Sequence, residues 1–250
     1  MRWLFALLLL ALPLQAEGVV LGLSQDEVAI TASFDGSEIL VFGAVKREDT
    51  IPDGPPLEVI VTIAGPSEPV MVRRKEKRFG IWVNADALEV DSAPSFYAVA
   101  TSGNLKDVLS DVEDLRHEIS IPRAIRSVGA PESISDAPNF TEALIRIRQN
   151  TDQYQLLENQ VVVDEQTLFR TRVSLPAALT EGAYPTRIFL TRDGAVVSSY
   201  ETAIDVKKVG LERWLYTLSR ENAVLYGLMS LAIAIAAGWG ASAAFNLIRQ

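Results

Sequence analysis

The segment Ala223–Ile248 contains 26 residues and no charged side chain. A helix rises about 1.5 Å per residue, so a helix of this length spans about 39 Å and can cross a hydrocarbon core of about 30 Å with some tilt. Charged side chains inside a bilayer are costly, and a long segment without them is typical of membrane-spanning helices. The sequence therefore predicts a C-terminal transmembrane helix over residues 223–248.

The N-terminal segment 1–16 has the layout of a secretory signal peptide. Arg2 is followed by an apolar stretch, by Pro13 and by the small residue Ala16, which is the order of charge, apolar core and cleavage site in such peptides. We expect cleavage after Ala16; the alternative is an uncleaved anchor, for which the apolar stretch is short. Export followed by arrest at the C-terminal helix predicts a single-pass protein of the bacterial inner membrane, with a periplasmic body and a cytoplasmic C-terminus.

The composition excludes several kinds of chemistry. The chain has no cysteine and one histidine, and its formal net charge at pH 7 is −9. Without cysteine there is no disulfide, no thiolate metal site and no thiol nucleophile. An acidic chain is also poorly suited to the phosphate backbone of nucleic acids, so we expect no nucleic-acid partner.

Period-two alternation of apolar residues dominates the segment 17–104. The runs are separated by turn residues such as Asp35-Gly36, a tight hairpin signal, and by the proline-rich stretch 52–56. Short strands at this density are typical of a small antiparallel sandwich, so residues 17–104 are predicted to form a first β module. The expected strands are Val19–Leu23, Val28–Phe34, Ile39–Val45, Leu57–Ile63, Val70–Arg73, Phe79–Val83 and Phe96–Ala100.

A cluster of cations occupies residues 73–78, between two of these expected strands. Charges of this kind discourage the addition of a further strand at a sheet edge, and a solvated hairpin is the interpretation that we favour. The alternative is a docking patch for anionic lipid headgroups or for an acidic partner. We predict that the nearby aromatic residues Phe79, Trp82, Phe96 and Tyr97 belong to the core.

Helical spacing follows in residues 105–160. The apolar stripe that includes Leu105, Leu109 and Leu115 predicts one helix over Leu105–Glu118. The segment Ile121–Asp136 carries proline and glycine and reads as a linker, and a second helix is expected over Asn139–Leu157. Residues 105–160 are thus predicted to be a helical and linker segment between two modules.

A second, smaller β module is predicted over residues 161–208. The dipeptide Asp193-Gly194 is the strongest hairpin signal in the chain. The fold class is therefore mainly β, with two immunoglobulin-like β-sandwich modules, short helices and one C-terminal transmembrane helix. The strands expected in the second module are Thr167–Leu175, Thr186–Arg192, Ala195–Tyr200 and Ala203–Val206.

Two sets of residues near the C-terminus are candidates for contact with the bilayer or with another helix. Residues 209–222 are expected to form a juxtamembrane helix, because apolar side chains share one of its faces. Aromatic residues prefer the membrane interface, and small residues let two helices approach closely inside a bilayer. The predicted interface anchors are Trp214, Tyr216 and Trp239. The predicted helix-packing residues are Ala232, Ala236, Gly240 and Ala244.

Recognisable catalytic patterns are missing from the sequence. His117 is the only histidine, so a multi-histidine metal site is impossible, and we interpret it as a surface residue. No nucleophile-elbow, phosphate-loop or dinucleotide pattern occurs. The acidic residues from Asp107 to Asp114 have helical spacing and lack the glycine-bearing loop of a calcium site, which favours a solvated helix face. We therefore predict no catalytic residue, no cofactor-binding residue, no cofactor and no metal site.

Several short stretches together resemble an uncharacterised family of alphaproteobacterial transmembrane proteins. The similarity covers nearly the whole chain after the N-terminal segment, and it implies a periplasmic body with one C-terminal span. It implies no activity and no site residues. The stretches that carry it are Gly80-Ile81-Trp82-Val83-Asn84, Ala93-Pro94-Ser95-Phe96-Tyr97, Thr167-Leu168-Phe169-Arg170, Leu175-Pro176-Ala177, Gly182-Ala183-Tyr184 and Leu225-Tyr226-Gly227-Leu228 before Gly238-Trp239.

Two functional hypotheses follow from the sequence. The first is a non-enzymatic, membrane-anchored periplasmic protein that acts as an accessory or assembly partner of another inner-membrane protein, such as a transporter. Its partners would be that protein, bound through the transmembrane helix or the periplasmic modules, and the lipid bilayer. The second is a sensory or small-molecule-binding ectodomain with a ligand between the modules, near residues 122–138.

Overall fold

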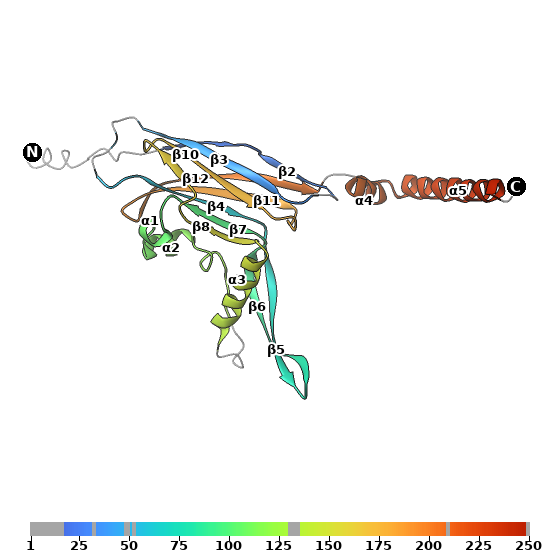
Figure 1. Cartoon of the computed structure of the whole chain (residues 1–250), viewed down its shortest axis with the longest axis horizontal. Coiled ribbons are helices and arrows are strands. Elements are labelled where there is room, and N and C mark those ends of the chain that lie inside the picture. Colours follow the sequence, from blue (N-terminus) through green and yellow to red (C-terminus); the bar gives the residue numbers. More distant parts are fainter. Residues whose placement is uncertain are drawn as a thin grey trace, which may run out of the picture. The chain divides into compact units, whose positions relative to one another are not determined.

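The computed structural model describes residues 18–31, 34–47, 51, 54–129, 136–208 and 211–248; the predicted signal peptide lies outside these ranges. The chain divides into two compact units. The first holds residues 34–206 together with the N-terminal residues up to Val28, and the second holds residues 207–250 together with 29–33. The first unit is mainly β, as predicted, and the second contains two helices (Figure 1).

Four strands form one antiparallel sheet, in the order β1-β3-β10-β9. Strand β10 shows why the sequence folds this way, because exposed and buried residues alternate along its whole length. Its buried residues, from Phe169 to Leu175, face the same side as Ile39 and Val41 of β3. One side of this sheet is therefore core. The strands are β1 (Gly18–Leu23), β3 (Ser37–Lys46), β9 (Val162–Asp164) and β10 (Leu168–Leu175).

Six strands form the second sheet, in the order β2-β12-β11-β4-β7-β8. All five residues of β7 are buried, as are the five central residues of β4, so the middle of this sheet is covered on both faces. Such strands read as continuous apolar runs. The strands are β2 (Glu27–Ile30), β4 (Glu58–Ala64), β7 (Tyr97–Thr101), β8 (Tyr154–Leu157), β11 (Gly182–Arg192) and β12 (Ala195–Lys208).

The two sheets each combine strands from both ends of the chain, which corrects the prediction of two separate sandwich modules. Strand β3 pairs with β10 over eight residues, and β4 pairs with β11 over six. Strands predicted for different modules are thus hydrogen-bonded to each other. The Asp35-Gly36 hairpin was also predicted wrongly, because β2 and β3 on either side of it belong to different sheets.

The Asp193-Gly194 hairpin is confirmed. Both residues have positive φ, 50° and 72°, as a two-residue type I′ turn requires, and they join β11 to β12. Strand β12 continues without interruption to Lys208, whereas the sequence predicted two shorter strands. Its long pairing with β11 keeps Glu201 and Thr202 in the sheet, although their polar side chains weaken the strand pattern.

The helix predicted over Leu105–Glu118 is two helices, α1 (Leu105–Val108) and α2 (Asp111–His117). Ser110 separates them because its hydroxyl accepts a hydrogen bond from the backbone of Glu113, at 3.4 Å, and so caps α2. The predicted solvated acidic face is only partly correct. Glu113 is buried, and Asp114 accepts hydrogen bonds from the backbone of Ser120 at 2.7 Å and from that of Ile119.

Helix α3 (Ala137–Asn150) ends earlier than predicted. Asp152 takes a positive φ of 56° after it, and residues 154–157, predicted as helix, form strand β8 alongside β7. This pairing is parallel and joins segments more than fifty residues apart in the chain, so local helical spacing gave no sign of it. The phenol of Tyr154 is buried there and donates to the carbonyl of Pro94 at 2.8 Å.

A long two-stranded ribbon, β5 (Ser67–Arg78) and β6 (Ile81–Pro94), projects from the rest of the first unit (Figure 1). The sequence predicted two short strands here, Val70–Arg73 and Phe79–Val83, of which the first is part of β5 and the second covers the turn and the start of β6. Its base is apolar: Val72, Leu88 and Val90 are buried in one cluster with Phe140 and Leu144 of α3. Helix α3 therefore supports the base of the ribbon and leaves its tip uncovered by the described part of the chain.

Arg74 fastens the ribbon to the start of α3. Its guanidinium donates to both carboxylate oxygens of Asp136, at 2.8 Å each, and lies 4.5 Å from the centre of the Phe140 ring. The hydrogen bonds from Arg74, followed by one from Asn139, hold the pKa of Asp136 below its ordinary value. Just beyond Arg74 the register of the ribbon shifts, so the support ends where the free tip begins.

The second unit contains α4 (Leu211–Glu221) and α5 (Ala223–Ile248), and α5 has the bounds of the predicted apolar segment. Backbone hydrogen bonds of 3.0 Å run from Asn222 to Leu218 and from Tyr226 to Asn222. These are helical i to i−4 bonds, so α4 continues into α5. In the described part of the chain, one helix, Ala223–Ser242 within α5, is long and apolar enough to cross a membrane.

We expect the substitution Arg74→Gln to lower the free energy of unfolding only slightly, because the ion pair that it removes is partly exposed. It should also raise amide hydrogen exchange at the start of α3 and at the base of the ribbon. The control is Arg73→Gln, an exposed neighbour on the same strand. Equal exchange in the two variants would show that Arg74 does not hold the ribbon.

We also expect stability to fall as the pH rises from about 10 to about 12. Burial raises the pKa of Tyr154 from 10.0 to about 12, against the opposing charge of Arg148. In this interval the unfolded chain loses the phenolic proton and the folded chain keeps it, so the stability that is complete below pH 10 is progressively lost. Denaturant unfolding at several pH values measures this. Tyr154→Phe should flatten the dependence, whereas Tyr200→Phe, at an exposed tyrosine, should not.

Candidate functional site

The tip of the β5–β6 ribbon is a two-residue turn at Phe79 and Gly80. Their φ angles are 50° and 84°, both in the left-handed region that a type I′ turn needs. Glycine adopts this conformation freely, but a bulky residue pays for it with about 1–2 kcal/mol of strain. Asparagine or aspartate is the usual residue at the first position, so phenylalanine is locally an unfavourable choice here.

Three large apolar side chains surround this turn without cover from the described chain. Phe79 is fully exposed, and Ile81 and Trp82 have 65% and 67% of their surface accessible. The prediction that Phe79 and Trp82 belong to the core is therefore wrong. The same prediction is confirmed for Phe96 and Tyr97, which are both 1% exposed.

Basic side chains accompany the apolar ones, on the opposite strand of the ribbon. Lys77 pairs across the ribbon with Trp82, and Arg78 pairs with Ile81. Cross-strand partners project to the same side, so each face of the tip carries a cation beside an apolar residue. Arg78 contacts Glu76 at 3.1 Å, whereas Lys75 and Lys77 form no ion pair with any described residue.

We call residues 75–83, with this turn at their centre, the ribbon tip. The cation run that leads into it was visible in the sequence. The turn was not predicted. A two-residue loop at Phe79-Gly80 places the neighbouring apolar residues at the exposed end of a hairpin, whereas the prediction had placed them in a strand of a sandwich. The available signal was Gly80, two residues after the last cation of the run.

The predicted membrane residues lie in the second unit. Ala232, Ala236 and Gly240 recur every fourth residue of α5 and are exposed; the side chain of Ala244 lies outside the described atoms. A Cβ placed on Gly240 would meet no atom within 4 Å. The predicted anchors Trp214 and Tyr216 are exposed on α4, and Trp239 is exposed on α5. No described residue of the second unit packs over this small-residue face.

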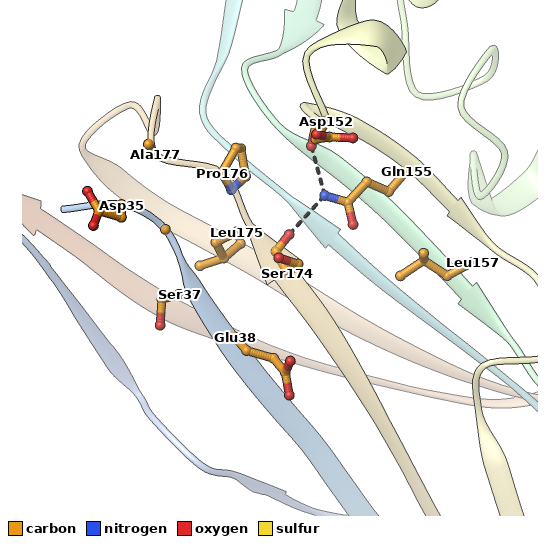
Figure 2. A pocket seen from close by; sticks show the side chains of 11 residues that line it. Asp35, Ser37, Glu38, Asp152, Gln155, Leu157, Ser174, Leu175, Pro176 and Ala177 are labelled. Carbon is orange, nitrogen blue, oxygen red and sulfur yellow. Dashed lines mark hydrogen bonds between the residues drawn. The ribbon is translucent and has the colours of Figure 1, made fainter.

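A shallow pocket of about 770 Å³ lies between β8, the edge strand of the six-stranded sheet, and the ends of β3 and β10 in the other sheet (Figure 2). Gln155 occupies its side, and its amide donates to the carbonyls of Asp152 and Ser174, at 2.7 and 2.8 Å (Figure 2). The amide donors of Gln155 are thus used within the protein. Asp35 and Glu38 add acidic groups to the lining, and Arg172, which lies 3.4 Å from Glu38, is not part of that lining, so this pocket is poorly suited to an anion.

A smaller groove, of about 430 Å³, lies between the start of α3 and the loop after α2. Its lining is mainly apolar and includes Pro122, Ile125, Pro138 and Ile145, with Glu142 as its charged residue. The sequence hypothesis placed a ligand near residues 122–138, between two modules. The groove is in that part of the chain, but it lies within a single unit.

His117 is half-buried, not on the open surface as predicted. Its imidazole packs on Phe189 with 5.4 Å between ring centres, and its Nε2 lies 3.3 Å from a carboxylate oxygen of Glu113. Arg116 contacts the other oxygen of Glu113 at 2.6 Å. Arg187 donates to the carbonyl of His117 at 2.8 Å and so satisfies the end of α2. These contacts of His117 are explained by side-chain packing and by the capping of α2. No group of three or more described histidine, aspartate or glutamate residues is placed to hold a metal ion.

The geometry thus gives two features that lack a partner within the described chain: the apolar α5 and the ribbon tip. Comparison with known proteins is consistent with α5 as a candidate membrane helix. Residues 18–247 match the family described as "Putative transmembrane protein (Alph_Pro_TM)", whereas no curated protein matches the sequence. Because the match extends over nearly the whole chain, this protein belongs to the alphaproteobacterial transmembrane protein family Alph_Pro_TM.

Proposed function

We propose that the protein is a non-enzymatic accessory or assembly partner of another inner-membrane protein, such as a transporter. In this proposal α5 crosses the inner membrane, the β-rich unit lies in the periplasm and the C-terminus is cytoplasmic. The N-terminal charge and apolar stretch support export. The absence of catalytic patterns in the sequence supports a binding role over an enzymatic one.

The observation that carries the proposal is the small-residue face of α5. Ala232, Ala236 and Gly240 lie along one side of the helix, about 6 Å apart. In a bilayer the hydrophobic effect does not drive helices together, and close packing over small residues is a main source of their association. This face is available for a helix of another membrane protein.

Substitution of this face should remove the partner. We expect Ala236→Leu with Gly240→Leu to abolish co-purification of the partner protein after cross-linking in cells, because the added side chains hold the helices apart. The matched control is Ala234→Leu with Gly238→Leu, which makes the same two changes on the opposite side of α5. Equal loss in both variants, or loss in neither, would contradict helix packing through this face.

Binding of a small molecule is the second candidate function, favoured by the apolar groove beside Pro122 and Pro138. Apolar grooves with few polar groups are common ligand sites. A ligand that binds the folded state raises the thermal midpoint, by mass action. We expect the full chain in nanodiscs to show such a rise with an apolar metabolite from a panel, and Ile145→Glu should remove it. A rise unaffected by this substitution would place the ligand elsewhere.

A further inference from the structure

The ribbon tip combines two kinds of side chain that rarely share an exposed surface. Phe79, Ile81 and Trp82 are exposed at the turn and along β6, while Lys75, Lys77 and Arg78 lie along β5. Large apolar side chains that are exposed together mark a surface that binds a protein, a ligand or a membrane. The charge of residues 75–83 is net positive in a chain whose net charge is −9, so the tip differs from the protein as a whole.

The construction of the tip also fits a surface that is presented outward. The base of the ribbon is buried against α3, and Arg74 fixes it through Asp136 and Phe140. A two-stranded ribbon alone is marginally stable in water, so this support allows a stable projection. Phe79 adopts a strained conformation at the furthest point and gains no compensating contact in the described chain. Strain of this kind is often found at functional positions.

From this arrangement we propose that the ribbon tip binds the surface of a bilayer that contains anionic phospholipids. The aromatic and aliphatic side chains enter the boundary between headgroups and acyl chains, where tryptophan in particular is favoured. Lys75, Lys77 and Arg78 contact the headgroup phosphates. The proposal does not depend on a partner protein for α5.

Charge and shape favour a bilayer over an acidic protein as the occupant. The apolar and basic residues are adjacent on both faces of a narrow tip, which suits insertion into a soft interface that closes around it. No groove or buried polar group at the tip offers the directional contacts that select one protein surface. Basic residues near an anionic membrane also act additively, so the cations need no fixed geometry.

The test uses the full chain held by α5 in nanodiscs of phosphatidylcholine, so that its own bilayer is neutral. The chain has no cysteine, and Phe79→Cys therefore gives one labelling site for an environment-sensitive fluorophore. Vesicles of phosphatidylcholine, with or without phosphatidylglycerol, are then added. We expect a blue shift and a gain in fluorescence with the anionic vesicles, and little change with the neutral ones.

Replacement of the three cations tests the electrostatic part. The triple variant Lys75→Gln, Lys77→Gln and Arg78→Gln should reduce the apparent affinity for anionic vesicles about a hundredfold, given the usual contribution of each basic residue near such a surface. The matched control replaces three exposed cations outside the ribbon by glutamine and should change little; they are Lys106, Arg123 and Arg126. An unchanged thermal midpoint shows that the variants are folded.

The apolar part has its own controls. Trp82→Ser should weaken the response, whereas Val112→Ser, at an exposed apolar position on α2, should not. A fluorophore at Leu115→Cys, a second exposed apolar position on α2 outside the ribbon, should report no change. The proposal is overturned if neutral vesicles give the same response, if the cation variants bind as before, or if the tip responds to no vesicle and instead cross-links to a protein in cells.

Discussion

Hydrogen bonding between β3 and β10, and between β4 and β11, determines the architecture of the first unit. These pairs join residues more than a hundred positions apart in the chain. They bring the five buried central residues of β4 into the middle of the six-stranded sheet, where each buried aliphatic side chain contributes about 1.5–3 kcal/mol. The closure of such long loops costs conformational entropy, and this shared core offsets it. Every other element of the unit is arranged around these pairs.

The projecting ribbon depends on that core in turn. Strands β5 and β6 connect β4 to β7, two adjacent strands in the centre of the sheet. A connection between neighbouring strands would need only a few residues, yet this one contains a ribbon with strands of 12 and 14 residues. Its base is buried against α3, and its end has apolar and basic residues in the open. An insertion of this length, held at one end and exposed at the other, is better explained by an interaction than by stability.

Much of the local structure could be predicted from the sequence. The strands at β3, β4, β7 and β10 follow from alternation or continuous apolar runs, and Asp193-Gly194 fixed its hairpin through the positive φ that these residues tolerate. The errors have non-local causes. Residues 154–157 became a strand because β7 offers an edge for parallel pairing. The helix over residues 105–118 was divided because Ser110 caps α2.

The sequence by itself determined the family and the candidate membrane-spanning helix, since the bilayer requires a length and a lack of charge that one continuous segment either has or does not have. The small residues of this helix could also be identified from the sequence. Only the tertiary structure decided how strands from both halves combine and which aromatic residues are exposed. Phe79 and Phe96 look alike as apolar positions in the sequence. Phe96 is 1% exposed and its ring lies near that of Tyr184, from a distant part of the chain, whereas nothing in the described chain covers Phe79. Burial depends on such distant contacts, and local patterns do not record them.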